Sequence, residues 1–273
     1  MPASSSLIHP VTLLLPHLPQ QLEGIRIAHL TDLHVSRPRR RYDRIEALLT
    51  NLRVDLAVLT GDYMEKEGDE DAVVRVMGRL CKAMRPRLGA YGVFGNHDTP
   101  QLRQRLTDLP IVWLNNQTHV FAQLPLRMMG FEADSGALPD SVATLLEYDA
   151  SSAGGAAADE ASSAGLRVLL CHFPTYLPTA ADLGVDVMFA GHTHGGQCRL
   201  PFALPLVNSS DLPLRLTSGI LRHRDTLAVV SRGLGESRLP LRIFCPPHLP
   251  VYTLCRGPMP GRSSDAVSNV QRW

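Results

Sequence analysis

The segment Ile25-Arg26-Ile27-Ala28-His29-Leu30 is a largely apolar run, and Thr31-Asp32-Leu33-His34 follows it at once. Four further apolar runs also end in polar clusters. They are residues 56–59 before Gly61-Asp62, 91–94 before Gly95-Asn96-His97-Asp98, 168–170 before Cys171-His172, and 185–190 before Gly191-His192-Thr193-His194. Polar residues at the ends of buried strands meet at one edge of a sheet, where open α/β folds bind their ligands. We therefore expect the five clusters to form one site.

The clusters contain carboxylate, imidazole and amide side chains, which are the ligand types of a binuclear metal site. A carboxylate has two oxygens and can bridge two cations, whereas imidazoles and an amide fill outer positions without cancelling the charge of the metals. Two divalent ions about 4 Å apart can stabilise both the attacking and the leaving oxygen of a phosphoester. The residue types therefore favour phosphoester cleavage.

Each cluster alone also has an ordinary structural explanation. A Gly-Asp pair is common in turns, Gly-Asn-His-Asp can form a tight turn, and Gly-His-Thr-His can form a solvated loop. A turn, however, requires neither two imidazoles nor a position after a buried strand. The joint occurrence of the clusters, each after a predicted strand, favours the metal site.

In this order the clusters resemble the calcineurin-like metallophosphoesterase superfamily, whose pattern is Asp-x-His, Gly-Asp, Gly-Asn-His-Asp/Glu, His and Gly-His-x-His. The resemblance implies an α/β fold, a two-sheet β-sandwich flanked by helices in four layers. It also implies two divalent metal ions, Mn, Fe, Zn or Co with Mn favoured, and a hydroxide shared by them that attacks phosphorus in line. The implied ligands are Asp32, His34 and His194 for one ion, Asn96, His172 and His192 for the other, and Asp62 as the bridge.

The resemblance assigns no metal to His97. We expect this histidine to stabilise the transition state or to protonate the leaving oxygen as a general acid. The neighbouring Asp98 is expected to orient His97 from behind. Alternatively, Asp98 caps a helix that begins at Thr99 or Pro100.

A narrower resemblance rests on residues 191–197, on 230–235 and on Pro240-Leu241-Arg242. These segments are similar to a bacterial phosphodiesterase branch that is often tethered at the cytoplasmic membrane and includes UDP-2,3-diacylglucosamine pyrophosphohydrolases. The resemblance implies a phosphodiester or pyrophosphate substrate, with a lipid-linked nucleotide as one candidate. Two alternatives stay open, namely a phosphomonoesterase or protein phosphatase, and a non-catalytic metal-binding scaffold.

A basic cluster, Arg37-Pro38-Arg39-Arg40-Arg41, follows the first ligand turn closely. Guanidinium groups bind phosphate through paired hydrogen bonds. We expect these arginines to hold the distal phosphate of a pyrophosphate substrate or to approach anionic lipid headgroups. The alternative is a solvated basic loop.

Composition is typical of one compact domain, because 44% of the 273 residues are hydrophobic and 19% are charged. Lys and Arg number 27 and Asp and Glu number 26, so no global field attracts nucleic acid. We predict no specific nucleic-acid partner and no protein partner. The five cysteines are expected to be reduced thiols.

The N-terminal region lacks the pattern of a membrane anchor. Its early apolar run, residues 11–15, is broken by Pro16 and Pro19 and is much shorter than the roughly 20 residues of a spanning helix. Since no Lys or Arg precedes Arg26, a standard secretion signal is not indicated either. We expect a cytoplasmic protein, with peripheral contact to the inner face of the membrane as a second expectation.

Periodicity predicts a helix over 43–52, with Asp43 as N-cap and Glu46 completing a capping box, and a second helix over 69–84. Together with the strands around them they form a βαβαβ pattern. Short strand-like runs at 111–114, 119–122, 126–130, 226–230 and 251–254 indicate a second sheet. The expected divisions are an N-terminal extension over 1–24, the catalytic domain over 25–256 and a polar tail over 257–273. The Ala-, Ser- and Gly-rich stretch 150–165 is expected to be a flexible surface loop, with a substrate lid as the alternative.

Overall fold

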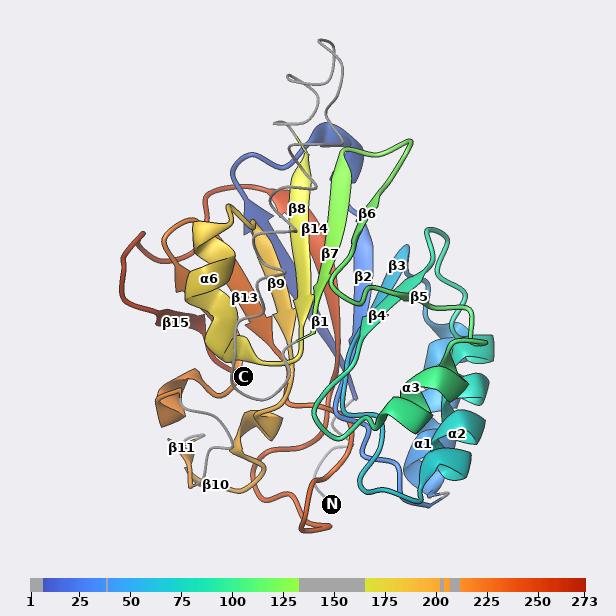
Figure 1. Ribbon diagram of the computed structural model, residues 1–273. Helices are drawn as coiled ribbons and strands as arrows, with labels where there is room; N and C mark the ends of the chain where they lie inside the picture. The colour runs from blue at the N-terminus through green and yellow to red at the C-terminus, as the bar shows by residue number, and fades with distance from the viewer. Residues whose placement is uncertain (1–6, 38, 133–164, 202–203, 207–211) are drawn as a thin grey trace.

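A computed structural model of the chain describes residues 7–37, 39–132, 165–201, 204–206 and 212–273. Two β-sheets pack face to face, and helices cover the outer face of each sheet (Figure 1). The predicted four-layer αββα sandwich is therefore confirmed. Of the stretch 150–165, all but Gly165 lies outside the described residues, as does the choice between loop and lid.

The first sheet carries the predicted βαβαβ segment. Its strands, in order across the sheet, are β1 (Ile8–Leu15), β14 (Leu249–Arg256), β2 (Arg26–Leu30), β3 (Leu56–Thr60), β4 (Ala90–Val93) and β5 (Val112–Trp113). The strands β2 to β5 run parallel. The helices on its outer face are α1 (Arg40–Asn51), α2 (Glu70–Ala83) and α3 (Pro100–Leu106).

The second sheet is mixed. Its order is β15 (Ser268–Gln271), β12 (Gly219–His223), β13 (Thr226–Val230), β9 (Val187–Ala190), β8 (Leu166–Cys171), β7 (Leu126–Phe131) and β6 (Thr118–Val120). Helix α6 (Leu177–Asp182) packs on its outer face. A short hairpin of β10 (Arg199–Leu200) and β11 (Leu204–Pro205) lies apart from both sheets. Short 3-10 turns complete the fold at Gln20–Leu22, Pro174–Tyr176, His194–Gly196 and Leu214–Leu216.

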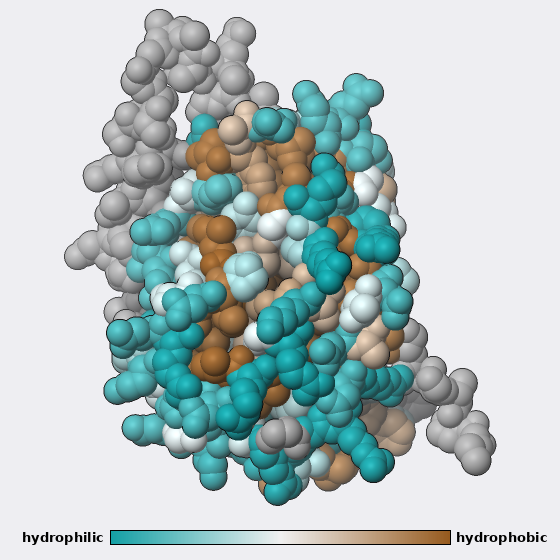
Figure 2. Space-filling model, turned by 90° about the vertical axis from the view of Figure 1, so that its right-hand side faces the viewer, coloured by the Kyte–Doolittle hydropathy of each residue, from teal (hydrophilic) through white to brown (hydrophobic). Residues whose placement is uncertain are grey.

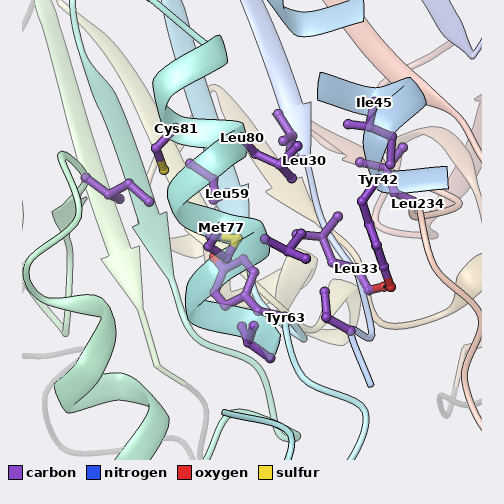
Figure 3. Close-up of a cluster of buried hydrophobic side chains, with 14 of the residues drawn as sticks. Leu30, Leu33, Tyr42, Ile45, Leu59, Tyr63, Met77, Leu80, Cys81 and Leu234 are labelled. Carbon is purple, nitrogen blue, oxygen red and sulfur yellow. The ribbon is translucent and has the colours of Figure 1, made fainter. Parts of the chain in front are cut away.

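Three hydrophobic cores separate the layers. Alternate residues of a strand face opposite sides, so Leu56 and Val58 of β3 pack between the sheets while Ala57 and Leu59 pack against the helices. This burial of both faces explains the continuous apolar runs of the sequence. Figure 3 shows the core under α1 and α2, where Tyr42, Ile45, Met77 and Leu80 surround Leu30 and Leu59. The strand ends that carry the polar clusters are thus held by packing on both sides.

Helix α1 begins earlier than predicted. Its N-cap is Arg39, and Asp43 lies in the first turn of the helix. The Glu46 carboxylate accepts a hydrogen bond from Arg79 Nε at 3.0 Å instead of completing a capping box. In this earlier first turn the amide of Tyr42 donates to the Arg39 carbonyl at 3.0 Å, and the buried Tyr42 side chain donates its hydroxyl to the Leu33 carbonyl at 3.3 Å. The second helix agrees with its prediction, with Asp69 and Met84 as its caps.

The expected N-terminal extension and polar tail each contribute a strand. Residues of β1 pair in parallel with β14, and β15 pairs antiparallel with β12. The side chains of Val11, Leu13 and Leu15 are buried between the sheets, and the ring of Trp273 packs on His9 and His248. The predicted boundaries at 25 and 256 therefore leave out two strands of the sandwich.

The side of the molecule that carries α3 is largely hydrophilic at its surface, with hydrophobic residues exposed between the polar ones (Figure 2). Such exposure is ordinary for a folded domain. None of the helices in the described ranges is long and apolar enough to cross a lipid bilayer.

Candidate metal centre

The predicted ligand turns follow strands of both sheets. Asp32 and His34 come after β2, Asp62 after β3, and the turn of Asn96, His97 and Asp98 after β4. From the second sheet, His172 follows β8, and His192 and His194 follow β9. Because all these strands run parallel within their sheets, their carboxyl ends reach the same edge of the sandwich.

Asp62 lies between the two predicted ligand sets. Its Oδ2 atom is 3.4 Å from Nε2 of His34 and 3.2 Å from Nε2 of His172. On one side, Nε2 of His194 lies 3.0 Å from Nε2 of His34 and 3.4 Å from Oδ1 of Asp32. This arrangement is suited to a bridging carboxylate between two cations.

Among the described residues, three groups of side chains could each hold a metal ion, namely two that contain the predicted ligands and a third of His34, Glu65 and His97. Asp32, His34 and His194 form one group, in which the ligand atoms lie within 4.8 Å of one another. Asp62, His172 and His192 form the second group by the same measure. Each of these two groups contains histidines that the sequence assigns to one ion, and the assignment of ligands to ions stays a prediction. Asn96 is exposed in the turn after β4, and its part as a ligand stays a prediction.

His172 tests whether these residues fit a metal. Its Nδ1 atom lies 2.6 Å from the Thr60 carbonyl oxygen, which can only accept, so Nδ1 carries the proton. In the neutral ring Nε2 then presents a lone pair to the Asp62 carboxylate, and this buried nitrogen makes no hydrogen bond. Two acceptors that face each other at 3.2 Å require a cation between them. The donor set therefore fits a metal ion.

The electrostatics of the cluster agree with this demand for positive charge. Burial works against the charged form of His34, but hydrogen bonds to Asp62 and Glu65 raise its pKa to about 10. Burial is similarly overcome at His172, whose pKa the Asp62 charge raises to about 9. Burial also opposes ionisation of Asp62, yet His172 and His34 hold its pKa well below its usual range. The carboxylates of the cluster therefore favour positive charge at the two imidazoles.

The backbone is strained at the ligands themselves. A positive φ is uncommon for residues other than glycine and marks functional sites when the fold enforces it. Five of the predicted ligands have such angles: Asp32 (50°), His34 (43°), Asp62 (55°), His192 (69°) and His194 (51°). Close approach of the turns requires glycine beside them, because a Cβ on Gly95 would overlap Asp62 and one on Gly191 would overlap Asp32. The fold thus presets the ligand geometry.

His97 is half-buried at the edge of the cluster. Its ring lies 4.8 Å from the ring of His34, and its backbone amide donates to Oδ1 of Asp62 at 3.0 Å. The ring is oriented by Nδ1, which lies 2.8 Å from the Glu65 carbonyl oxygen. The position of His97 suits a general acid whose Nε2 points away from its anchor.

Glu65 is a site residue that the sequence interpretation missed. Its Oε2 atom lies 2.8 Å from Nδ1 of His34, and its Oε1 atom accepts the backbone amide of Arg238 at 2.9 Å. Carboxylates that bind the second nitrogen of a ligating histidine fix the orientation of the ring. In the sequence, the one indication that Glu65 lies near the site is its position three residues after Asp62.

Asp98 is not the residue that orients His97. Its buried carboxylate accepts hydrogen bonds from the backbone amides of Asp62 at 2.9 Å, Tyr63 at 2.8 Å and Gly95 at 2.8 Å. Burial and the nearby Asp62 raise the pKa of Asp98 to about 6. It does not cap the next helix either, because Thr99 accepts from the amide of Leu102. Asp98 instead holds together the turns that follow β3 and β4.

The arginine cluster lies beside the ligand turns. Arg39 pairs with Glu236 at 3.2 Å, and Arg41 pairs with the same carboxylate oxygen. The preceding Gly235 donates its amide to the carbonyl of Asp32 at 2.6 Å. Arg37 and Arg40 are exposed. Phosphate binding by this cluster stays a prediction.

Arg242 is a second residue without a role in the sequence prediction. Its guanidinium donates to the carbonyls of Arg232 at 2.7 Å and His194 at 3.3 Å and also lies 3.3 Å from Nδ1 of His194. A further hydrogen bond from Nε reaches the Gly235 carbonyl at 2.8 Å. The side chain therefore fastens His194 to the turn that packs on Asp32.

Comparison with known proteins places this geometry in a family. Residues 25–196, which include every predicted ligand, match the family described as calcineurin-like phosphoesterase. Similar proteins include the uncharacterized metallophosphoesterase YkoQ of Bacillus subtilis strain 168, which is 24% identical over 84% of this chain and 83% of its own length.

Two further relatives have names that state an activity. Phosphodiesterase YaeI of Escherichia coli strain K12 is 29% identical over 84% of this chain and 82% of its own length. UDP-2,3-diacylglucosamine pyrophosphatase LpxG of Chlamydia muridarum strain MoPn / Nigg is 25% identical over 86% of this chain and 85% of its own length. The chain belongs to the calcineurin-like phosphoesterase family, and it is a phosphoric ester hydrolase.

Proposed function

We propose that the protein hydrolyses a phosphodiester or pyrophosphate bond and that its substrate is a lipid-linked nucleotide. The observation that carries the proposal is the place of Asp62, whose one carboxylate oxygen faces His34 at 3.4 Å and His172 at 3.2 Å. In this proposal Asp62 would bridge two divalent ions, with Mn favoured. Asp32, His34 and His194 would hold one ion, and Asn96, His172 and His192 would hold the other.

When bound, such ions supply the positive charge that an in-line displacement at phosphorus requires. The chain itself positions the reacting groups. His97, anchored through Nδ1 at the Glu65 carbonyl, directs Nε2 toward the leaving oxygen and gives it a proton. Asp98 keeps the turns of Asp62 and His97 in register through backbone hydrogen bonds.

The lipid-linked nucleotide is supported by two features. One relative, matched over 86% of this chain and 85% of its own length, is named as a UDP-2,3-diacylglucosamine pyrophosphatase. The arginine cluster beside the ligand turns offers guanidinium groups of the kind that bind the second phosphate of a pyrophosphate. With such a substrate the enzyme works at the cytoplasmic face of the inner membrane.

Hydrolysis assays with metal-stripped protein reloaded with Mn test the proposal. The substrates are bis-p-nitrophenyl phosphate, p-nitrophenyl phosphate and UDP-2,3-diacylglucosamine in detergent, and Asp62→Ala is the inactive control. Preferential cleavage of the lipid nucleotide is expected. Cleavage of the simple diester alone would remove the lipid nucleotide from the proposal, and cleavage of the monoester alone would replace it with a phosphomonoesterase. Inactivity toward all three would favour a scaffold without catalytic function.

A further inference from the structure

Large apolar side chains are exposed on two segments beside the metal centre. Phe244 is 66% exposed and Leu239 is 63% exposed, although such side chains are usually buried. Together with their neighbours they form a set that we name the apolar rim. Its members are Leu200, Leu206, Leu239, Leu241, Ile243 and Phe244.

Backbone contacts join the two segments of the rim into one surface. Cys198 and Ile243 form a β-bridge, and the amide of Arg199 donates to the Ile243 carbonyl at 2.9 Å. The Gln197 side chain donates to the carbonyl of Leu239 at 3.0 Å. The hairpin of β10 and β11, which includes Leu200, lies at the lower end of the molecule in Figure 1. The two segments that carry the exposed side chains therefore lie side by side.

The rim borders the metal centre directly. In the segment that runs from Leu239 to Phe244, Leu241 and Ile243 are exposed. Arg242 between them points inward and donates to the carbonyl of His194. The other segment of the rim, which contains Leu200 and Leu206, begins a few residues after His194. A molecule bound at the rim therefore lies next to the predicted ligands.

Cationic side chains flank the rim. Arg238 is exposed in the rim loop itself, and Arg37 and Arg40 are exposed on the neighbouring arginine cluster. The ion pairs of Glu236 with Arg39 and Arg41 tie that cluster to the rim loop. Glu236 is neutralised by these pairs, so the flank is left with excess positive charge.

We propose that the apolar rim docks on a lipid bilayer that carries anionic headgroups. Exposed leucine and phenylalanine side chains enter the boundary between headgroups and acyl chains, and flanking arginines bind headgroup phosphates. This complementarity of charge and apolarity favours a lipid surface over a second copy of the chain, whose rim would carry the same arginines. The role of this docking rests on the proposed function, because docking would bring a lipid-linked phosphoester to the metal centre.

Vesicle sedimentation tests the docking. The full chain is mixed with vesicles of phosphatidylcholine alone or with phosphatidylglycerol, and the pelleted fraction is measured. The wild-type protein is expected to pellet with the anionic vesicles and to be released by salt. The variant Leu239→Ser/Leu241→Ser/Phe244→Ser should partition about tenfold less, because three apolar side chains no longer enter the bilayer.

The matched control is Val112→Ser/Val120→Ser, which removes exposed apolar side chains from strands β5 and β6, away from the rim. It should pellet like the wild type. A wild-type protein that stays in the supernatant overturns the docking, as does a triple variant that pellets like the control. Light scattering that reveals a dimer lost in the triple variant would also overturn it, by assigning the rim to a second copy.

Hydrolysis of bis-p-nitrophenyl phosphate separates this inference from the proposed function. The triple variant should cleave this soluble diester at the wild-type rate, since none of its residues belongs to the metal centre. Vesicle binding by a protein that cleaves neither diester nor lipid nucleotide would refute the proposed function and leave the docking intact. Cleavage of the lipid nucleotide in detergent without vesicle binding would refute the docking and leave the proposed function intact.

Discussion

The Nε2 atoms of His34 and His194 lie 3.0 Å apart, although 160 positions separate the two residues in the chain. One histidine follows a strand of the first sheet and the other follows a strand of the second. A shared cation is the simplest partner for two imidazole nitrogens at this distance. The pair therefore marks the place where the two sheets jointly build one half of the metal centre.

Replacing His194 by alanine should remove one metal ion and leave the other. The second group, around His172, keeps its ligands in this variant. Elemental analysis of protein reloaded with Mn measures the stoichiometry. His119→Ala, on strand β6 of the second sheet, is the control and should retain both ions. Loss of both ions in the His194 variant would contradict the division into two groups.

His97→Ala should keep the metal and lose most turnover. A positioned general acid contributes about 100- to 10,000-fold to the rate. His97 shares a possible metal-binding group with His34 and Glu65, but the two groups around Asp32 and Asp62 keep all their ligands without it. Asp62→Ala, in contrast, should lose both metal and activity. The measurements are kcat on bis-p-nitrophenyl phosphate and metal content. Unchanged kcat in the first variant would remove His97 from the mechanism.

Asp98→Ala should destabilise the fold. The substitution leaves the buried backbone amides of Asp62, Tyr63 and Gly95 without their acceptor. Because each unsatisfied buried donor costs about 1 to 3 kcal/mol, we expect the free energy of unfolding to fall by at least about 3 kcal/mol. Urea denaturation measures the change. Asp98→Asn, which keeps an acceptor oxygen, should lose less, and equal losses in both variants would contradict this role.

Arg242→Gln should weaken metal binding without contacting the metal. The variant loses the guanidinium contacts to His194 and to the Gly235 turn. Removal of residues that support a metal ligand typically lowers metal affinity about 10- to 100-fold. Calorimetric titration with Mn should show the loss for one of the two ions. Arg224→Ala, which breaks surface ion pairs with Asp182 and Asp265, should bind both ions normally.

His29 should make stability dependent on pH. Burial between the sheets lowers its pKa to about 3, whereas the unfolded chain has the ordinary value near 6.5. Below pH 6.5 the unfolded state therefore binds a proton that the folded state refuses, and stability falls as pH falls toward 3. His29→Gln should reduce the slope of unfolding free energy against pH by up to about 1.4 kcal/mol per unit in this window.

Urea titrations of the metal-stripped protein between pH 6.5 and 4 measure this slope. The same substitution at His17, whose side chain is exposed in the folded protein, is the control and should leave the slope unchanged. A His29 variant with the wild-type slope would show that this buried ring is not responsible.

The ligand turns could be predicted because strand ends and chemistry coincide in the sequence. Buried parallel strands are apolar on both faces, as in β3, so each run stops visibly where Asp62 begins its turn. The edge strands β1 and β15 carry a weaker pattern in the sequence. In β1 only alternate residues such as Leu13 and Leu15 are fully buried, and the polar composition of residues 257–273 conceals β15.

The supporting residues could not be predicted because their partners are distant in the chain. Glu65 contacts His34, and Arg242 contacts His194, through loops whose paths are set by tertiary packing. The same holds for the pairing of Glu236 with Arg39 and Arg41, which lie about 200 positions earlier. Local patterns identify ligands, whereas the side chains that orient them depend on the assembled sandwich.

The left-handed backbone of the ligands limits how this centre can be transplanted. Grafting the seven side chains onto the strand ends of another sheet would place them on relaxed turns, where Asp62 and the histidines would point elsewhere. A successful graft would have to carry Gly95 and Gly191 and the paired turns around them. For protein engineering, the portable unit is therefore the set of interlocked loops, and the metal ligands are only its visible part.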